Sequence, residues 1–172
     1  MLNTVVNAVA PWVNPVIDYH SLAPEMVLAA GLCVVLLADL FMDESRKWII
    51  SSLAGFTLLG AMLPVLTLGL HDTDVRSMFD GRFVVDNFSL VIKALFLLAG
   101  YVVVLLSSNH VEEDEYWRGE YYFLLLSSIL GMVMISSSRD LVSIFVALEF
   151  LSIPAYMLAA WRKRDIKSNE AG

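Results

Sequence analysis

Apolar residues gather into five long runs along the chain, and a short polar stretch separates each run from the next. A bilayer core about 30 Å thick requires about 20 mainly apolar residues in a helix. Transmembrane strands are shorter and alternate in polarity, whereas these runs are apolar on all sides. The pattern therefore predicts an all-α integral membrane protein with transmembrane helices at Ser21–Phe41, Trp48–Leu70, Asp86–Ser108, Glu120–Ser137 and Asp140–Trp161.

Residues that favour helix starts support these boundaries. Pro24 suits the first turn of the first span, and Glu25 beside it lies near the positive end of the helix dipole. Asp86 and Asp140 stand where N-caps are expected for the third and fifth spans. The longest connector, residues 71–85, is too short for a soluble domain, so residues 1–172 are expected to form a single membrane domain.

The composition narrows the class of function. Hydrophobic residues make up 58% of the chain and charged residues only 17%, where a soluble domain carries about 25% charged residues. The net charge of −7 and the single basic cluster, within residues 162–167, argue against a nucleic-acid partner. That cluster follows the last span, which is typical of a cytoplasmic membrane anchor beside lipid. The single cysteine, Cys33, and the three histidines lack metal-ligand spacing, so no cofactor is expected in this chain.

The distribution of Lys and Arg predicts the orientation in the membrane, because cytoplasmic loops carry an excess of both. With the N-terminus outside, the inside segments hold seven basic residues: Arg46, Lys47, Arg118, Arg162, Lys163, Arg164 and Lys167. The outside segments then hold three: Arg76, Arg82 and Arg139. The excess predicts an outside N-terminus and a cytoplasmic C-terminus.

Glu149 is the deepest charged residue of the predicted spans. It lies about nine residues into the last span, roughly 13 Å from the outer end at 1.5 Å per residue. Its helical neighbours include no cation, and only Ser152 could donate a hydrogen bond to it. A carboxyl in this position is either a proton relay or a structural glutamic acid bonded to a neighbouring helix. Pro154 either frees a carbonyl close to Glu149 or is an ordinary transmembrane proline.

Lys93 is the second charged residue inside a span, about seven residues from its start. Lysine side chains near a helix end commonly extend to the interface and keep the ammonium in water. The alternative is that Lys93 faces the helix bundle and pairs with Glu149, whose estimated depth differs by a few ångströms. Both interpretations remain open from the residues alone.

The stretch around Glu149, RDLVSIFVALEFLSIPAYMLAAWRKRDIKSNEAG, resembles the fifth-helix region of the N subunit of proton-pumping NADH:quinone oxidoreductase, respiratory complex I. It is also similar to the equivalent subunit of the chloroplast and cyanobacterial enzyme. Three further stretches carry the same resemblance: APEMVLAAGLCVVLLADLF, FVVDNFSLVIKALFLLAG and EYYFLLLSSILGMVMISSSRDL. The similarity covers most of the chain from about Leu22 onward.

The resemblance implies an antiporter-like subunit of about 14 helices in the membrane arm of the complex. In such subunits a glutamate on helix five, here Glu149, pairs with a lysine on helix seven, and the pair takes part in proton translocation coupled to quinone reduction. The sequence ends at Gly172, where the sixth helix is expected, so Glu149 would depend on a lysine from the remainder of the subunit. Lys93 has no counterpart in that relay and is retained as a separate candidate.

The same resemblance implies the surroundings of the chain. Its partners would be other membrane-arm subunits, the remainder of the same subunit and lipids, in a bacterial inner membrane or an equivalent energy-transducing membrane. NADH, flavin, iron–sulfur clusters and quinone would be bound by other subunits. Two alternatives remain: a subunit of a related Na⁺/H⁺ antiporter or membrane-bound hydrogenase, and a purely structural membrane subunit.

Overall fold

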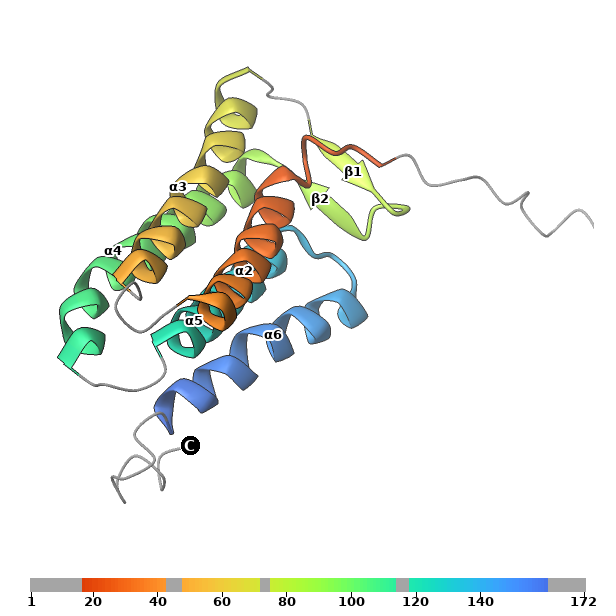
Figure 1. The fold of residues 1–172 in the computed structure, drawn as a ribbon. Coiled ribbons are helices and arrows are strands. Elements are labelled where there is room, and N and C mark those ends of the chain that lie inside the picture. Colours follow the sequence, from red (N-terminus) through yellow and green to blue (C-terminus); the bar gives the residue numbers. More distant parts are fainter. Residues whose placement is uncertain (1–16, 43–47, 72–74, 114–117, 161–172) are drawn as a thin grey trace, which may run out of the picture.

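The computed structural model describes residues 17–42, 48–71, 75–113 and 118–160 of the chain (Figure 1). Five of its helices are long and apolar enough to cross a membrane, which confirms the predicted fold class. They are α2 (Ala23–Phe41), α3 (Trp48–His71), α4 (Asn87–Glu113), α5 (Arg118–Ser137) and α6 (Leu141–Ala159). The basic cluster at residues 162–167, and Arg46 and Lys47 of the orientation argument, lie outside the described residues.

The predicted helix starts are also confirmed. Pro24 occupies the first turn of α2. The Asp86 carboxylate accepts a hydrogen bond from the Ser89 backbone N–H at 2.8 Å, and the Ser89 hydroxyl accepts one from the Asp86 N–H at 2.9 Å. These two bonds form a reciprocal cap for α4. Asp140 accepts a bond from the Ser143 N–H and so caps α6.

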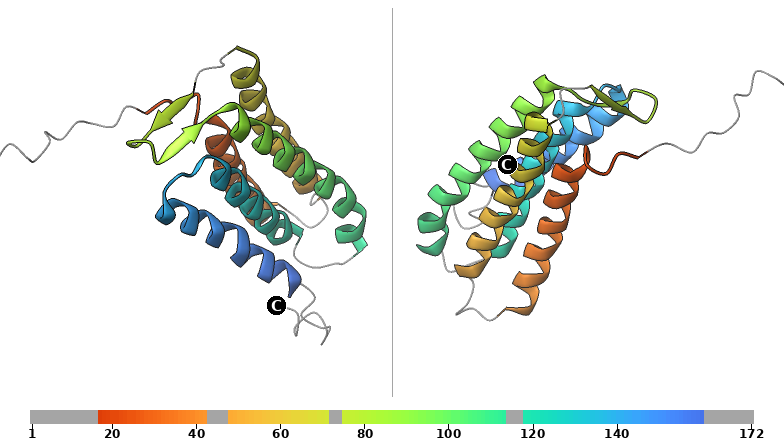
Figure 2. Two further views of the ribbon diagram at one scale, coloured as in Figure 1. Left: turned by 180° about the vertical axis from the view of Figure 1, so that it is seen from behind. Right: turned by 90° about the horizontal axis from the view of Figure 1, so that it is seen from above.

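Helix α5 is the centre of the bundle. It packs against α2, α4 and α6, and α3 covers the outer side of α2 and α4 (Figure 2). Within its most apolar stretch, 61% of the residues of α5 are buried, against 11% for α6, so α6 is a peripheral helix of the described bundle. The core contains Leu28, Leu58, Leu97, Leu126 and Ile129.

Gly131 permits the close contact between α5 and α6. A Cβ atom at this position would lie 2.6 Å from the Leu151 nitrogen and 2.8 Å from the Ala147 oxygen, both backbone atoms of α6. Nearby, the Ser128 hydroxyl of α5 donates a hydrogen bond to the Leu151 carbonyl at 3.2 Å. The α6 backbone therefore lies directly on the glycine, as in other membrane helix pairs with small residues at the contact.

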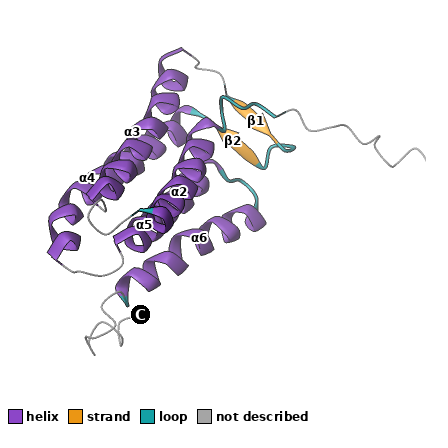
Figure 3. Cartoon of the chain, viewed as in Figure 1, coloured by secondary structure: helices purple, strands orange, loops and turns teal. Residues whose placement is uncertain are grey.

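A β-hairpin lies over one end of the bundle, in the connector between α3 and α4 (Figure 3). Strands β1 (Arg76–Met78) and β2 (Phe83–Val85) pair antiparallel, and the hydrophobic pattern did not predict them. The turn between them holds Phe79, Asp80 and Gly81 at positive φ. Only glycine adopts that conformation freely, so the first two residues are strained locally.

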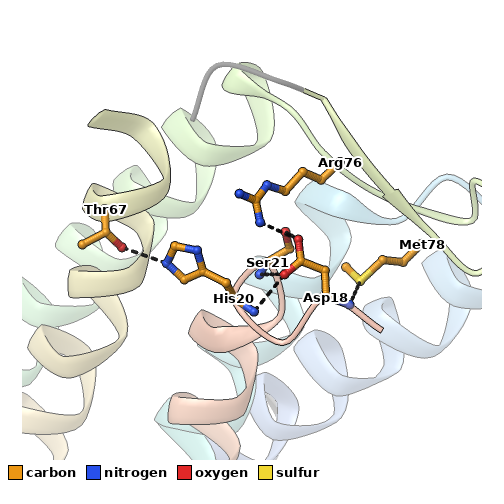
Figure 4. A network of polar contacts seen from close by, with 6 residues as sticks. All are labelled: Asp18, His20, Ser21, Thr67, Arg76 and Met78. Atoms are coloured by element: carbon orange, nitrogen blue, oxygen red, sulfur yellow. Dashed lines mark hydrogen bonds and ion pairs between the residues drawn. The ribbon is translucent and has the colours of Figure 1, made fainter. Parts of the chain in front are cut away.

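Polar contacts join the hairpin to the segments that precede α2 and α6. The Asp18 carboxylate accepts bonds from the Arg76 guanidinium and the Ser21 hydroxyl (Figure 4). Burial raises the pKa of Asp18, but these bonds and the Arg76 charge outweigh it and lower the pKa to about 2. On either side of β2, the Arg139 N–H donates to the Arg82 carbonyl in the turn at 2.8 Å, and the Arg139 side chain forms an ion pair with Asp86, also at 2.8 Å.

Replacing Gly131 by Ala tests the α5–α6 contact. The added methyl group meets backbone atoms that cannot rotate away, so we expect Gly131→Ala to lower the free energy of unfolding by about 1–3 kcal/mol. Gly69→Ala in α3 is the matched control, because no atom lies within 4 Å of its added Cβ. Unfolding of the full chain in detergent, followed by circular dichroism, measures both. Equal stability of the two variants would contradict the close contact.

Candidate functional site

Glu149 lies in the middle of α6 and is half-buried. The buried residues of this helix, Ala147 and Pro154, face α5, and Glu149 is turned by about 200° from Ala147 at 100° per residue. Its neighbours one turn away, Phe145 and Ile153, are exposed. Glu149 therefore lies on the face of α6 that no described helix covers.

Within the described part of the chain, Glu149 has no ion-pair partner and no side-chain hydrogen bond. Ser152, which the sequence offered as a donor, gives its hydroxyl hydrogen to the Leu148 carbonyl at 2.7 Å. Helix α6 continues through Pro154, whose missing N–H leaves the Phe150 carbonyl without its helical donor. A group that pairs with Glu149 must come from beyond these residues.

Lys93 faces the interior of the bundle, as the second interpretation of the sequence expected, but with a different partner. Its side chain is completely buried and so does not extend into water. Its Nζ lies 2.7 Å from Oε1 of Glu25, in the first turn of α2, and 5.2 Å from the centroid of the Phe83 ring. The structure therefore corrects the proposed pairing of Lys93 with Glu149: Lys93 lies near the hairpin and pairs with Glu25.

Glu25 is the residue that the sequence interpretation did not identify as a candidate. An acidic residue in a first helical turn is ordinary on dipole grounds, and its position near the span end suggested no burial. In the structure its side chain is only 10% exposed. Its second oxygen, Oε2, has no hydrogen-bond partner among the described residues. The only available signal was a second ionisable residue inside a span, Lys93, that required a counter-charge.

An open cavity of about 460 Å³ reaches Glu25 from the hairpin end of the bundle. Its lining includes Arg82 and Phe83 of the hairpin, Ser138 after the end of α5, and Ser143 in the first turn of α6. The described residues contain no group of three His, Cys, Asp or Glu side chains arranged to hold a metal ion. Apart from Asp39 and Glu120, which lie close to the ends of their spans, the charged residues of the described spans are therefore a carboxylate–ammonium pair beside a cavity and Glu149 on an uncovered face.

Five helices that are long and apolar enough to span a membrane define a multi-pass α-helical membrane protein. No family model matches the chain. Curated relatives indicate a narrower group of proteins than the fold does. Subunit N of the NADH-quinone oxidoreductase of Anoxybacillus flavithermus is 40% identical over 156 residues, which are 90% of this chain and 31% of the relative.

Two further relatives agree. Subunit N from Thioalkalivibrio sulfidiphilus is 32% identical over 90% of this chain and 32% of its own length. Subunit 2 of the NAD(P)H-quinone oxidoreductase of Synechococcus elongatus is 39% identical over 86% of this chain and 28% of its own length. Over about nine-tenths of its own length the chain is thus similar to subunit N of NADH-quinone oxidoreductases, and it spans about a third of the length of these relatives.

A double-mutant cycle tests the buried ion pair. Lys93→Met leaves the Glu25 carboxylate without its counter-charge, so we expect a loss of about 3–5 kcal/mol in the free energy of unfolding. Adding Glu25→Gln removes the unpaired charge and should recover most of that loss. The measurement is unfolding of the full chain in detergent.

Arg139→Met is the matched control for this cycle. It breaks the ion pair with Asp86 at the exposed end of the bundle, where such pairs contribute about 0–1 kcal/mol. If Lys93→Met costs no more than Arg139→Met, or if the double variant is as unstable as Lys93→Met, the two buried charges are not coupled.

Proposed function

We propose that this chain is part of a membrane-arm subunit of an NADH:quinone oxidoreductase and takes part in proton translocation coupled to quinone reduction. The observation that carries the proposal is the placement of Glu149, a carboxylate in the middle of a membrane-spanning helix, in a homologue of subunit N. Glu149 is the protonatable group. It takes up a proton, holds it while shielded from water, and releases it when a nearby positive charge approaches.

The uncovered face of α6 supports a partner outside the described residues. Glu149 and its exposed neighbours Phe145 and Ile153 require cover from further helices, since an isolated carboxylate facing lipid is costly. The remainder of the subunit supplies that cover and the positive charge that tunes Glu149. The other membrane-arm subunits and lipids surround it, and NADH, flavin, iron–sulfur clusters and quinone bind to other subunits.

The proposed location is a bacterial inner membrane or an equivalent energy-transducing membrane. Helices α2, α4 and α6 begin at the hairpin end, where Arg76, Arg82 and Arg139 are the basic residues. The excess of Lys and Arg in the other connectors supports an orientation with the hairpin outside and the C-terminus in the cytoplasm.

Glu149→Gln tests the proton-carrying role. The amide keeps the size and polarity of the side chain but cannot exchange a proton, so we expect coupled pumping to be lost while the complex still assembles. The measurement is proton uptake into vesicles that contain the assembled complex with the full-length subunit, with electron transfer measured in parallel.

Glu120→Gln is the matched control, because Glu120 is also a half-buried glutamate but lies in the first turn of α5. It should leave pumping unchanged. Normal pumping by Glu149→Gln would exclude the relay and favour a purely structural subunit. Dependence of the transport on Na⁺ in place of protons would favour the antiporter alternative.

The orientation has its own test. Single cysteines replacing Asp80 at the hairpin turn or Ser168 near the C-terminus, in a Cys33→Ser background, are exposed to a membrane-impermeant thiol reagent in intact cells. We expect labelling at position 80 and none at position 168 until the membrane is opened. The reverse pattern would invert the proposed orientation.

A further inference from the structure

Glu25 is a buried ionisable group that the proposed function does not use. Its side chain is nine-tenths buried, yet it lines the 460 Å³ cavity at the hairpin end. One carboxylate oxygen contacts Lys93, and the other has no partner among the described residues. A buried oxygen in that condition loses its hydration without compensation, unless water reaches it. The cavity is many times larger than the ~30 Å³ that one water occupies.

The charges around Glu25 come from two elements. Helix α4 supplies Lys93, and the hairpin supplies Arg82 on the cavity lining. The α5 and α6 side of the cavity offers the uncharged hydroxyls of Ser138 and Ser143, and the only titratable residue of α3 is His71, exposed at the helix end. No other carboxylate among the described residues competes for Lys93.

Of the other acidic residues at this end, Asp80 is exposed at the hairpin turn and Asp140 caps α6, and two more have charged partners. Asp18 is bound by Arg76 and Ser21, and Asp86 by Ser89 and Arg139. The Ser89 N–H first, and the Arg139 charge in addition, hold the pKa of Asp86 below its usual range. Both of these carboxylates therefore stay ionised and fixed, whereas Glu25 is on the cavity lining and has an oxygen without a hydrogen-bond partner among the described residues.

We propose that Glu25 is a second proton-exchanging carboxyl of this chain, reached by water through the cavity at the hairpin end. In the exchange, a hydronium ion in the cavity gives its proton to Oε2 of Glu25. One O–H bond forms on the carboxylate, one breaks in the hydronium, and a water molecule is left. The reverse step returns the proton to the same water.

Lys93 acts as a positioning residue in this exchange. The face of the Phe83 ring, whose centroid is 5.2 Å from Nζ, stabilises the ammonium when Glu25 becomes neutral. Protonation of Glu25 thereby removes the counter-charge of Lys93 and weakens the link between α2 and α4. The proposal concerns a different carboxyl from Glu149 and holds or fails independently of the proposed function.

Infrared difference spectroscopy of the full chain in lipid vesicles tests the exchange. A pH titration reports protonated carboxyl groups by their C=O band. We expect Glu25→Gln to lose one titrating band that Glu149→Gln and the control Glu120→Gln retain. Glu25→Asp, which keeps a carboxyl group, should shift that band instead of losing it. If the parent chain and Glu25→Gln give the same bands, Glu25 does not exchange protons and the pair is a fixed ion pair only.

The route is tested by blocking the cavity. In the Cys33→Ser background, Ser143→Cys places a thiol on the cavity lining, and Ser52→Cys places one near the start of α3 at the opposite end of the bundle. A bulky thiol reagent on Ser143→Cys should slow deuterium exchange of the Glu25 band severalfold, and the same reagent on Ser52→Cys should not. Equal rates in both blocked variants would overturn the cavity as the route.

Discussion

The buried charge of Lys93 is the constraint on which the arrangement of this bundle depends. An ammonium group inside an apolar helix requires a counter-charge, because its desolvation is otherwise uncompensated. Glu25 supplies that charge at 2.7 Å, although the backbones of α2 and α4 do not pack directly on each other. The long lysine side chain joins two helices that α3 separates in sequence. The hairpin then covers the pair with the Phe83 ring.

A steric constraint complements this electrostatic one at α5. Because Gly131 has no side chain, the backbone of α6 lies directly against α5, with Ala147 buried in the contact. The same contact fixes the rotation of α6 about its axis and turns Glu149 to the opposite side. The position of the carboxylate in the membrane plane therefore follows from a glycine on another helix. The face of α6 that carries Glu149 is uncovered in this chain, which spans about a third of the length of its relatives.

The hairpin covers one end of the bundle. Arg76 of β1 binds Asp18, Arg139 from the connector between α5 and α6 binds Asp86 directly after β2, and the turn between the strands is strained at Phe79 and Asp80. The cavity lies between this cover, the first turns of α2 and α6 and the end of α5. Glu25 and Glu149 thus lie in distinct surroundings: Glu25 beside a cation and a cavity, and Glu149 on a face that no described helix covers.

The sequence by itself determined the five helices, their caps at Asp86 and Asp140, and the depth of Glu149, because these depend on local composition and on residues one turn apart. It did not determine the partner of Lys93 or the hairpin. Helical spacing identifies only neighbours within one helix, whereas Glu25 lies on another helix, 68 positions before Lys93 (93 − 25 = 68). Short strands between charged residues leave no apolar pattern to detect. Only the tertiary structure decided the partner of Lys93. The desolvation free energy of a buried charge is offset by an opposite charge that lies close in space, and that charge can come from any part of the sequence.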